Sequence, residues 1–130
     1  MDINLVKMQQ TIKTILIKIG IRCDLAGFQY LCHAIQHAIL KPNNSKNLCS
    51  DIYVEIAHIN NLKTYSTIER NIRHAIDKAY ERTGFEELNR MFNAQLYTRK
   101  QKPTAGELIK LVSEYYLLDL YNQQLSLSTK

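Results

Sequence analysis

Hydrophobic residues recur along this chain at spacings of three and four, and nowhere do hydrophobic and polar positions alternate as in a strand. This periodicity predicts six helices, through residues 5–19, 28–39, 48–58, 64–83 and 85–93 and from residue 104 onward. Gly20 and Gly84 are expected to end the first and the fourth helix. We therefore predict an all-α fold with one six-helix domain over residues 1–120. The polar tail at 121–130 has little to bury and should fray.

Each predicted helix has one apolar side, and these sides define the expected core. The inward residues are Leu5, Met8, Ile12, Ile15, Leu16, Ile19, Phe28, Leu31, Cys32, Ile35, Ile39, Leu48, Ile52, Ile56, Ile59, Ile68, Ile72, Ala75, Ile76, Ala79, Phe85, Leu88, Phe92, Leu108, Leu111, Val112 and Tyr115. Leucine and tyrosine are more frequent at 115–125 than one buried face needs. The surplus either completes the core or forms a dimer contact.

Two helix starts have the spacing of a capping box, in which a hydroxyl side chain precedes a glutamate by three residues. The pairs are Ser66 with Glu69 and Thr104 with Glu107. We predict that each hydroxyl caps the first turn and that each carboxylate reaches back toward it.

The composition excludes several classes of protein. A content of 45% hydrophobic residues in a chain of 130 is too high for disorder and sufficient for a core. No apolar run approaches the roughly 20 residues that span a bilayer, and no signal peptide is visible, so we expect a cytoplasmic protein. Cys23, Cys32 and Cys49 lack disulfide or metal spacing and are expected to be buried, reduced side chains.

Positive charge gathers in one part of the chain. The net charge is +5, and residues 63–102 hold nine Lys or Arg against five Asp or Glu. Such an excess suits a phosphate-binding surface, although many basic proteins never contact nucleic acid. The segment Arg99–Lys102 places three basic residues before a helix start, where it either clamps a DNA backbone or forms an ordinary charged loop.

The order of elements is that of a helix-turn-helix. The short helix at 48–58 is followed by a polar turn and by the amphipathic helix at 64–83. Opposite the buried side of this second helix, a helical projection places Ser66, Arg70 and Arg73, flanked by Glu69 and His74.

These residue types suit the recognition of double-stranded DNA. Arg70 is placed to hold guanine O6 and N7 in the major groove. Glu69 and His74 would assist base reading, and the backbone contacts would come from Ser66, Thr67, Arg73 and Lys102. The same pattern also fits a solvated face with pairs such as Arg73–Asp77, and the residues alone do not separate the two interpretations.

His33 and His37 have a spacing that can bind a metal ion. Ala34 stands where a zinc-protease helix carries its catalytic glutamate, and no third ligand is evident. We therefore expect solvent-facing histidines. Glycine-rich phosphate loops and catalytic triads are absent from the sequence, so we expect no enzyme, no metal and no cofactor.

Five segments carry a resemblance to a known family: Ile19–Ile21, Gly27–Ile35, Asp51–Ala57, Ser66–Asp77 and Lys102–Ile109. In this order and spacing they resemble the C-terminal DNA-binding effector domain of the response regulator that initiates endospore formation. The resemblance covers roughly residues 11–118.

The resemblance implies six helices with a helix-turn-helix in the third and fourth. It further implies binding to promoter boxes, often as tandem or dimeric domains, and contact with an RNA polymerase sigma factor. The family's base-reading and phosphate-contacting positions fall on Glu69, Arg70, Arg73 and His74. Thr67 stands where the family usually has arginine, and Asn71 replaces a small residue, so the contact made there is expected to differ.

The family's regulators carry a phosphorylated receiver domain ahead of this domain, whereas the present chain begins almost directly at it with Met1. We expect a complete protein whose amount or partner, rather than receiver phosphorylation, sets its activity. The predicted function is that of a nucleoid-associated transcription regulator with the helix 64–83 in the major groove. The alternative is an interaction module of the same fold that binds a full-length regulator or a sigma factor instead of DNA.

Overall fold

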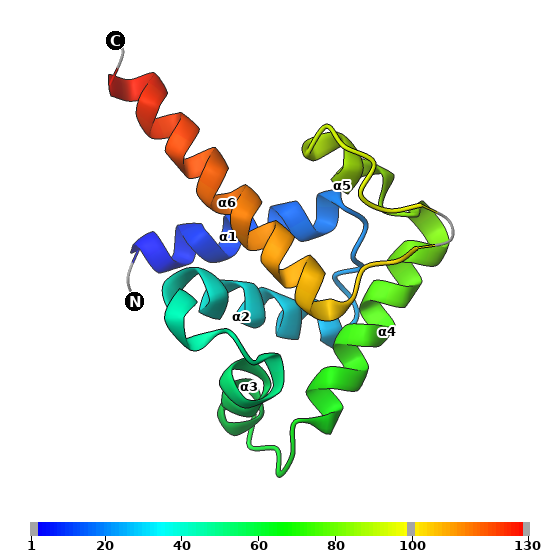
Figure 1. Ribbon diagram of the computed structural model, residues 1–130. Helices are drawn as coiled ribbons and strands as arrows, with labels where there is room; N and C mark the ends of the chain where they lie inside the picture. Colours follow the sequence, from blue (N-terminus) through cyan, green and yellow to red (C-terminus); the bar gives the residue numbers. More distant parts are fainter. Residues whose placement is uncertain (1–2, 99–100, 129–130) are drawn as a thin grey trace.

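The computed structural model describes residues 3–98 and 101–128, and its regular structure is helical (Figure 1). The helices within these ranges are α1 (Ile3–Lys18), α2 (Ala26–Leu40), α3 (Val54–Ile59), α4 (Ser66–Thr83), α5 (Glu86–Met91) and α6 (Ala105–Ser128). A 3₁₀ turn, η1 (Pro42–Asn44), and a π-helical segment, η2 (Leu48–Tyr53), lead into α3. The predicted all-α fold of six helices in one domain is confirmed.

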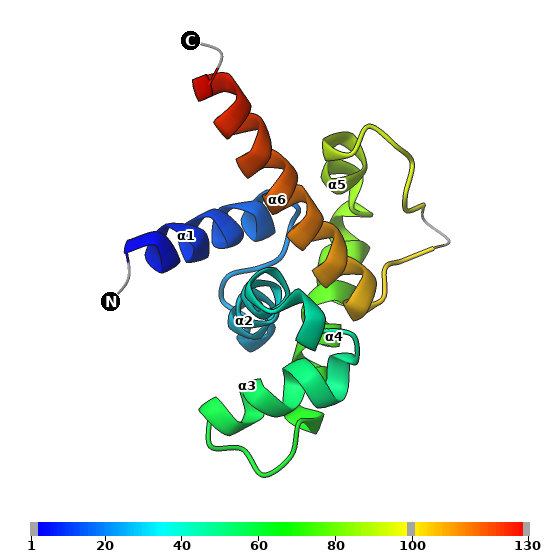
Figure 2. The same ribbon diagram turned by 60° about the vertical axis from the view of Figure 1, so that its left-hand side comes forward.

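The helix α2 lies at the centre of the molecule, where α1, α4 and α6 pack against it (Figures 1 and 2). Its side chains Leu31, Ala34 and Ile35 are completely buried. Gly27 lets α4 approach closely, because a Cβ atom there would lie 2.2 Å from the carbonyl oxygen of Asn71. The contact between α2 and α4 therefore depends on a residue without a side chain, and this contact orients α4.

The predicted core is largely confirmed. The inward residues of α4 and most of those of α1 and α2 are buried. Ile59 is a wrong prediction, because it lies at the end of α3 and is 57% exposed. Among the cysteines only Cys32 is buried; Cys23 is exposed and Cys49 is half-buried, and all three are free thiols.

The predicted ends of α1 and α4, at Gly20 and Gly84, are confirmed. Gly20 and Gly84 have φ angles of +103° and +62°, a conformation that costs glycine little. The N–H of Gly84 donates to the carbonyl of Tyr80 at 2.8 Å and closes α4.

The predicted capping boxes are confirmed only in part. Thr104 caps α6, because its Oγ1 accepts from the N–H of Glu107 at 3.2 Å. The carboxylate of Glu107 does not reach back; it accepts from the hydroxyl of Tyr97 at 3.1 Å. The box at the start of α4 is wrong, because Tyr65 is the cap residue, lies in the right-handed helical region, and makes no side-chain capping bond.

The C-terminal half of α6 projects from the body of the molecule (Figures 1 and 2). The tail was predicted to fray, but the helix continues to Ser128. The described side chains from 121 to 127 are nevertheless all exposed, as expected of a segment with nothing to bury. Among the described residues, no helix is both long enough and apolar enough to cross a bilayer.

Candidate nucleic-acid interface

A helix-turn-helix is formed by η2 and α3, the connector 60–65 and α4. The turn is closed after α3 by Asn61, whose φ of +57° is the left-handed conformation that asparagine tolerates better than most residues. The N–H of Leu62 returns to the carbonyl of Ala57 at 2.8 Å, and the side-chain amide of Asn60 donates to the carbonyl of Ile56 at 2.7 Å. These bonds fix how the chain enters α4.

The first helix of the motif is capped at Asn47. The Asn47 Oδ1 atom accepts from the N–H of Ser50 at 3.1 Å, and the Asn47 N–H donates to Asp51 Oδ2 at 2.9 Å. The two side chains thus satisfy donors that a helix start would leave free. The wider π-helical turn then passes into α3 at Val54, whose N–H donates to the carbonyl of Cys49.

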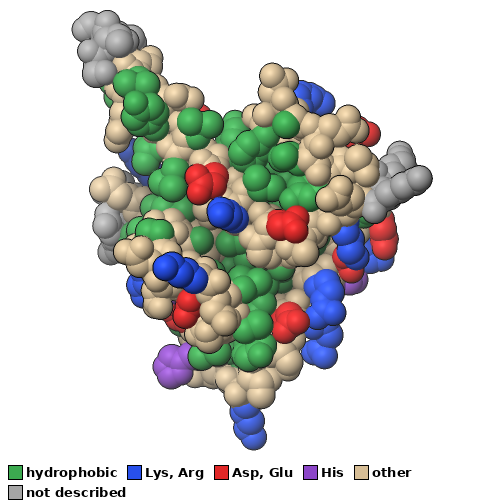
Figure 3. All heavy atoms as spheres, viewed as in Figure 1, with side chains coloured by type: hydrophobic (Ala, Val, Ile, Leu, Met, Phe, Trp, Pro, Cys, Tyr) green, Lys and Arg blue, Asp and Glu red, His purple; other side chains and the backbone are tan. Residues whose placement is uncertain are grey.

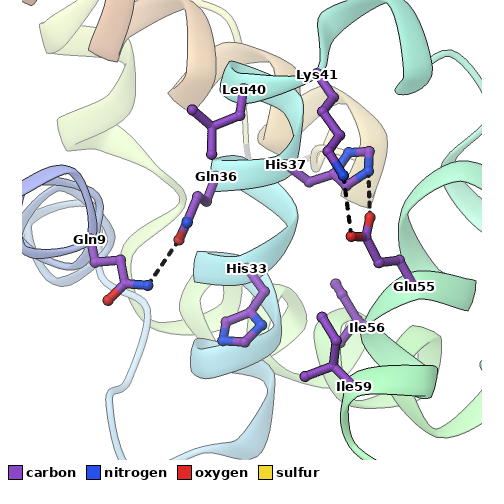
Figure 4. Close-up of a pocket in the computed structure, with 9 residues that line it drawn as sticks. All are labelled: Gln9, His33, Gln36, His37, Leu40, Lys41, Glu55, Ile56 and Ile59. Carbon is purple, nitrogen blue, oxygen red and sulfur yellow. Dashed lines mark hydrogen bonds and ion pairs between the residues drawn. The ribbon is translucent and has the colours of Figure 1, made fainter. Parts of the chain in front are cut away.

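A charged contact attaches this helix to α2 (Figure 4). The Nε2 atom of His37 lies 2.6 Å from a carboxylate oxygen of Glu55, and Lys41 Nζ lies 3.5 Å from the other oxygen. The other ring nitrogen of His37 lies 2.9 Å from Ser45 Oγ. The prediction that both histidines face solvent is wrong for His37, which is 8% exposed; His33 is half-buried.

The outer face of α4 presents the side chains that the sequence assigned to DNA contact. Ser66, Arg70, Arg73 and His74 are exposed, whereas Glu69 and Thr67 are half-buried. Within the described ranges, Arg70 and His74 make no hydrogen bond or ion pair with the protein. Their polar groups are therefore available to an external partner.

Two ion pairs order the rest of this face. Arg73 Nη2 lies 3.4 Å from Glu69 Oε1, and Lys102 Nζ lies 2.7 Å from Asp77 Oδ1. The predicted pair Arg73–Asp77 is thus wrong, since each residue has another partner. Lys102 comes from the connector before α6, so the fold brings it beside α4 across 25 residues of sequence. Arg99 and Lys100, the other basic residues of that connector, lie outside the described residues.

Thr67 and Asn71 are the two positions that differ from the family pattern. The polar groups at and beside them form hydrogen bonds within α4 or with the connector before it. The side-chain amide of Asn71 donates to the carbonyl of Thr67 at 2.8 Å. The hydroxyl of Ser66 shares a hydrogen bond of 2.8 Å with the hydroxyl of Thr64. Ser66, the first residue of α4, and Thr64, in the connector before it, are both exposed, so their hydroxyls are accessible from outside.

Basic side chains line the edge of the molecule that α4 forms (Figure 3). Their neighbours on α4 include carboxylates, so the face is mixed in charge rather than uniformly positive. Within the part of the chain that the structure describes, no group of three or more His, Cys, Asp and Glu side chains is placed to hold a metal ion. The geometry offers exposed hydrogen-bond donors on a helix of 18 residues.

Comparison with known protein families gives a match over most of the chain. Residues 12–116 match the family described as the C terminal of the sporulation initiation factor Spo0A. The matched range includes the helix-turn-helix, the connector that carries Lys102 and the first half of α6.

Proposed function

The chain belongs to the family of Spo0A C-terminal effector domains, which bind DNA, and we propose that it recognises promoter DNA sequence-specifically with α4 in the major groove. The observation that carries this proposal is the state of Arg70. Its guanidinium is exposed in the first turns of α4 and has no protein partner within the described residues. An arginine so placed can donate two hydrogen bonds to guanine O6 and N7.

The neighbouring side chains have supporting roles in this proposal. Glu69 and His74 flank Arg70 and read adjacent base edges, with Glu69 accepting from cytosine N4. Arg73, Ser66, Thr67 and Lys102 contact the sugar–phosphate backbone and set the register of α4. Arg73 and Lys102 exchange their carboxylate partners for phosphates when DNA binds.

The experiment is a selection of bound sites from randomised duplexes, followed by affinity measurements on the selected site. Anisotropy titrations at several salt concentrations would compare that site with a random duplex of equal length. We expect one preferred motif, tighter binding to it than to random DNA, and affinity that falls steeply with salt because counterions are released. Selection of no motif, or equal affinity for both duplexes, would contradict base reading.

A second function, binding to another protein, is favoured by the projecting part of α6. Leu118, Tyr121 and Leu127 are 54%, 58% and 73% exposed there. A helix with this many exposed apolar side chains suits a partner helix or groove, whether on a second copy, a full-length regulator or a sigma factor. Sedimentation of the purified protein, alone and with sigma factor, would test this function separately from DNA binding.

A further inference from the structure

A cleft of about 500 Å³ opens between η2, α4 and the start of α6. It is lined by Leu48, Cys49, Tyr53, Glu69, Arg73, Ile76, Asp77, Lys102, Pro103, Thr104, Ala105 and Gly106. Figure 3 shows this face, with hydrophobic side chains gathered between α3 and α4 and charged ones at the α4 edge. Its size falls within the roughly 300–1,000 Å³ that sites for small molecules occupy.

The wall of the cleft is mainly apolar. Leu48 and Ile76 face it from the two helices of the DNA-binding motif, and Pro103 and Ala105 face it from the start of α6. Gly106 lines the cleft without a side chain, and a Cβ atom there would make one ordinary contact, 3.8 Å from Leu48 Cδ2. An apolar wall with a few polar groups is typical of a site that takes a small organic molecule.

One polar group in this wall has no protein partner. Tyr53 is 1% exposed, and its hydroxyl bonds to no protein group within the described residues. Burial raises the pKa of this hydroxyl well above its ordinary value, Cys49 and Glu69 raise it further, and Arg73 opposes them. Tyr53 and all three of these neighbours line the cleft, so an acceptor bound there would lie beside the side chain that carries the unpaired hydroxyl. A buried donor without an acceptor is costly, and a bound acceptor would remove that cost.

The start of α6 adds positive potential at the same place. The amides of Ala105 and Gly106 lie in its first turn, where a helix has no acceptor for them, and the helix has 24 residues. The ammonium group of Lys102 stands at the rim. Arg73 is paired with Glu69, and Lys102 is paired with Asp77. The donors that remain for a ligand are therefore the first-turn amides of α6 and the Tyr53 hydroxyl.

We propose that this cleft binds a small carboxylate with an apolar body, the carboxylate accepting from the Tyr53 hydroxyl and the body packing against Leu48, Ile76 and Pro103. The site is separate from the outer face of α4 that carries Arg70. It shares Glu69 and Arg73 with that face, so its occupant alters the recognition helix. This coupling rests on the proposed function, whereas the site itself does not.

Benzoate is the probe, and toluene, which has the ring without the acceptor, is its matched control. Titration of the full chain followed by NMR should shift the amide signals of Ala105 and Gly106 with benzoate at millimolar concentrations. Tyr53→Phe removes only the hydroxyl and should weaken benzoate binding about fivefold to tenfold, as expected for one hydrogen bond. Its effect on toluene should be negligible, and its free energy of unfolding should equal or exceed that of the wild type.

Ala105→Leu supplies a second test, because the larger side chain fills the cleft from its edge and should abolish the benzoate shifts. The site is overturned if benzoate shifts no cleft signal, or if Tyr53→Phe binds benzoate as tightly as the wild type. Duplex titrations with and without benzoate test the coupling alone, and unchanged duplex affinity would overturn it. A chain that binds benzoate but no preferred DNA would instead refute the proposed function and leave the site standing.

Discussion

The Nε2 atom of His37 lies 2.6 Å from the Oε2 atom of Glu55, and this pair joins the central helix α2 to α3, in the first half of the helix-turn-helix (Figure 4). The contact is a close approach of the two groups rather than an aligned hydrogen bond, and it becomes an ion pair when the imidazole is protonated. Ser45 holds the other side of the ring, because its hydroxyl donates to the Lys41 carbonyl at 2.8 Å and so accepts from His37 Nδ1. The imidazole is thus fixed from both sides.

Replacing Glu55 with alanine should therefore loosen α3. Glu55 is 40% exposed, so solvent screens the pair, and we expect a loss of about 1 kcal/mol in the free energy of unfolding. Urea denaturation measures this loss. Glu81→Ala is the matched control, because Glu81 is 68% exposed and lies 3.9 Å from Lys78. Equal stability of the two variants would show that the pair with His37 contributes nothing.

Gly27→Ala should destabilise the protein and displace α4. The new Cβ atom would lie 2.2 Å from Asn71 O and 2.8 Å from Ala75 Cβ, so the two helices must separate. We expect a loss of roughly 1–3 kcal/mol, the usual cost of overpacking a core, measured by thermal or urea unfolding.

Gly106→Ala is the control for this substitution. Its Cβ atom would make only an ordinary contact, 3.8 Å from Leu48 Cδ2, and alanine favours a helix by about 0.5–1 kcal/mol over glycine. The control should therefore be neutral or stabilising. If Gly27→Ala were equally neutral, the close approach of α2 and α4 would not be a requirement of the fold.

The helices and most of the core could be predicted from the sequence, because the spacing of apolar residues within a short segment already marks which side of a helix is buried. The failures have non-local or conformational causes. His37 lies opposite the predicted core stripe of α2, but Ser45 from the loop after α2 and Glu55 from α3 contact its two ring nitrogens, and the side chain is buried. Ser66 has the spacing of a cap, but capping depends on the backbone conformation of the preceding residue, and Tyr65 is already helical.

The candidate site shows the same division. A helical projection correctly placed Arg70 and Arg73 on the exposed side of α4. It could not predict that Lys102 pairs with Asp77, since that contact depends on how the connector before α6 returns to α4. The cleft beside Tyr53 was likewise beyond the sequence, because three segments distant in the chain form its wall.

Alkaline pH should destabilise the fold through Tyr97. Burial and the hydrogen bond to Glu107 raise the pKa of Tyr97 from 10.0 to about 12. The folded state therefore holds the phenolic proton more tightly than the unfolded state does. This contribution to stability is complete below pH 10 and is lost as the pH rises through about 12.

Tyr97→Phe tests this dependence. The variant should lose one late-titrating tyrosine of the eight in the chain, followed by tyrosinate absorbance. Its stability should also decline less between pH 10 and about 12 than that of the wild type. If the absorbance lost in the variant instead belonged to the step near pH 10.0, Tyr97 would ionise at its ordinary pH and the prediction would be wrong.

The roles of Arg70 and Arg73 should separate in their effects on DNA binding. Arg70→Ala should cost about 1–3 kcal/mol on the selected site, relax the preference at one base pair, and change binding to random DNA less. Arg73→Ala should weaken binding to both duplexes alike and lower the slope of log affinity against log salt by about one, as loss of a phosphate contact does. Anisotropy titrations on the two duplexes measure both effects.

Lys78→Ala is the control, since Lys78 lies on the same helix and is paired with Glu81. Equal losses on both duplexes for Arg70→Ala would assign that arginine to the backbone and leave base reading to Glu69 or His74.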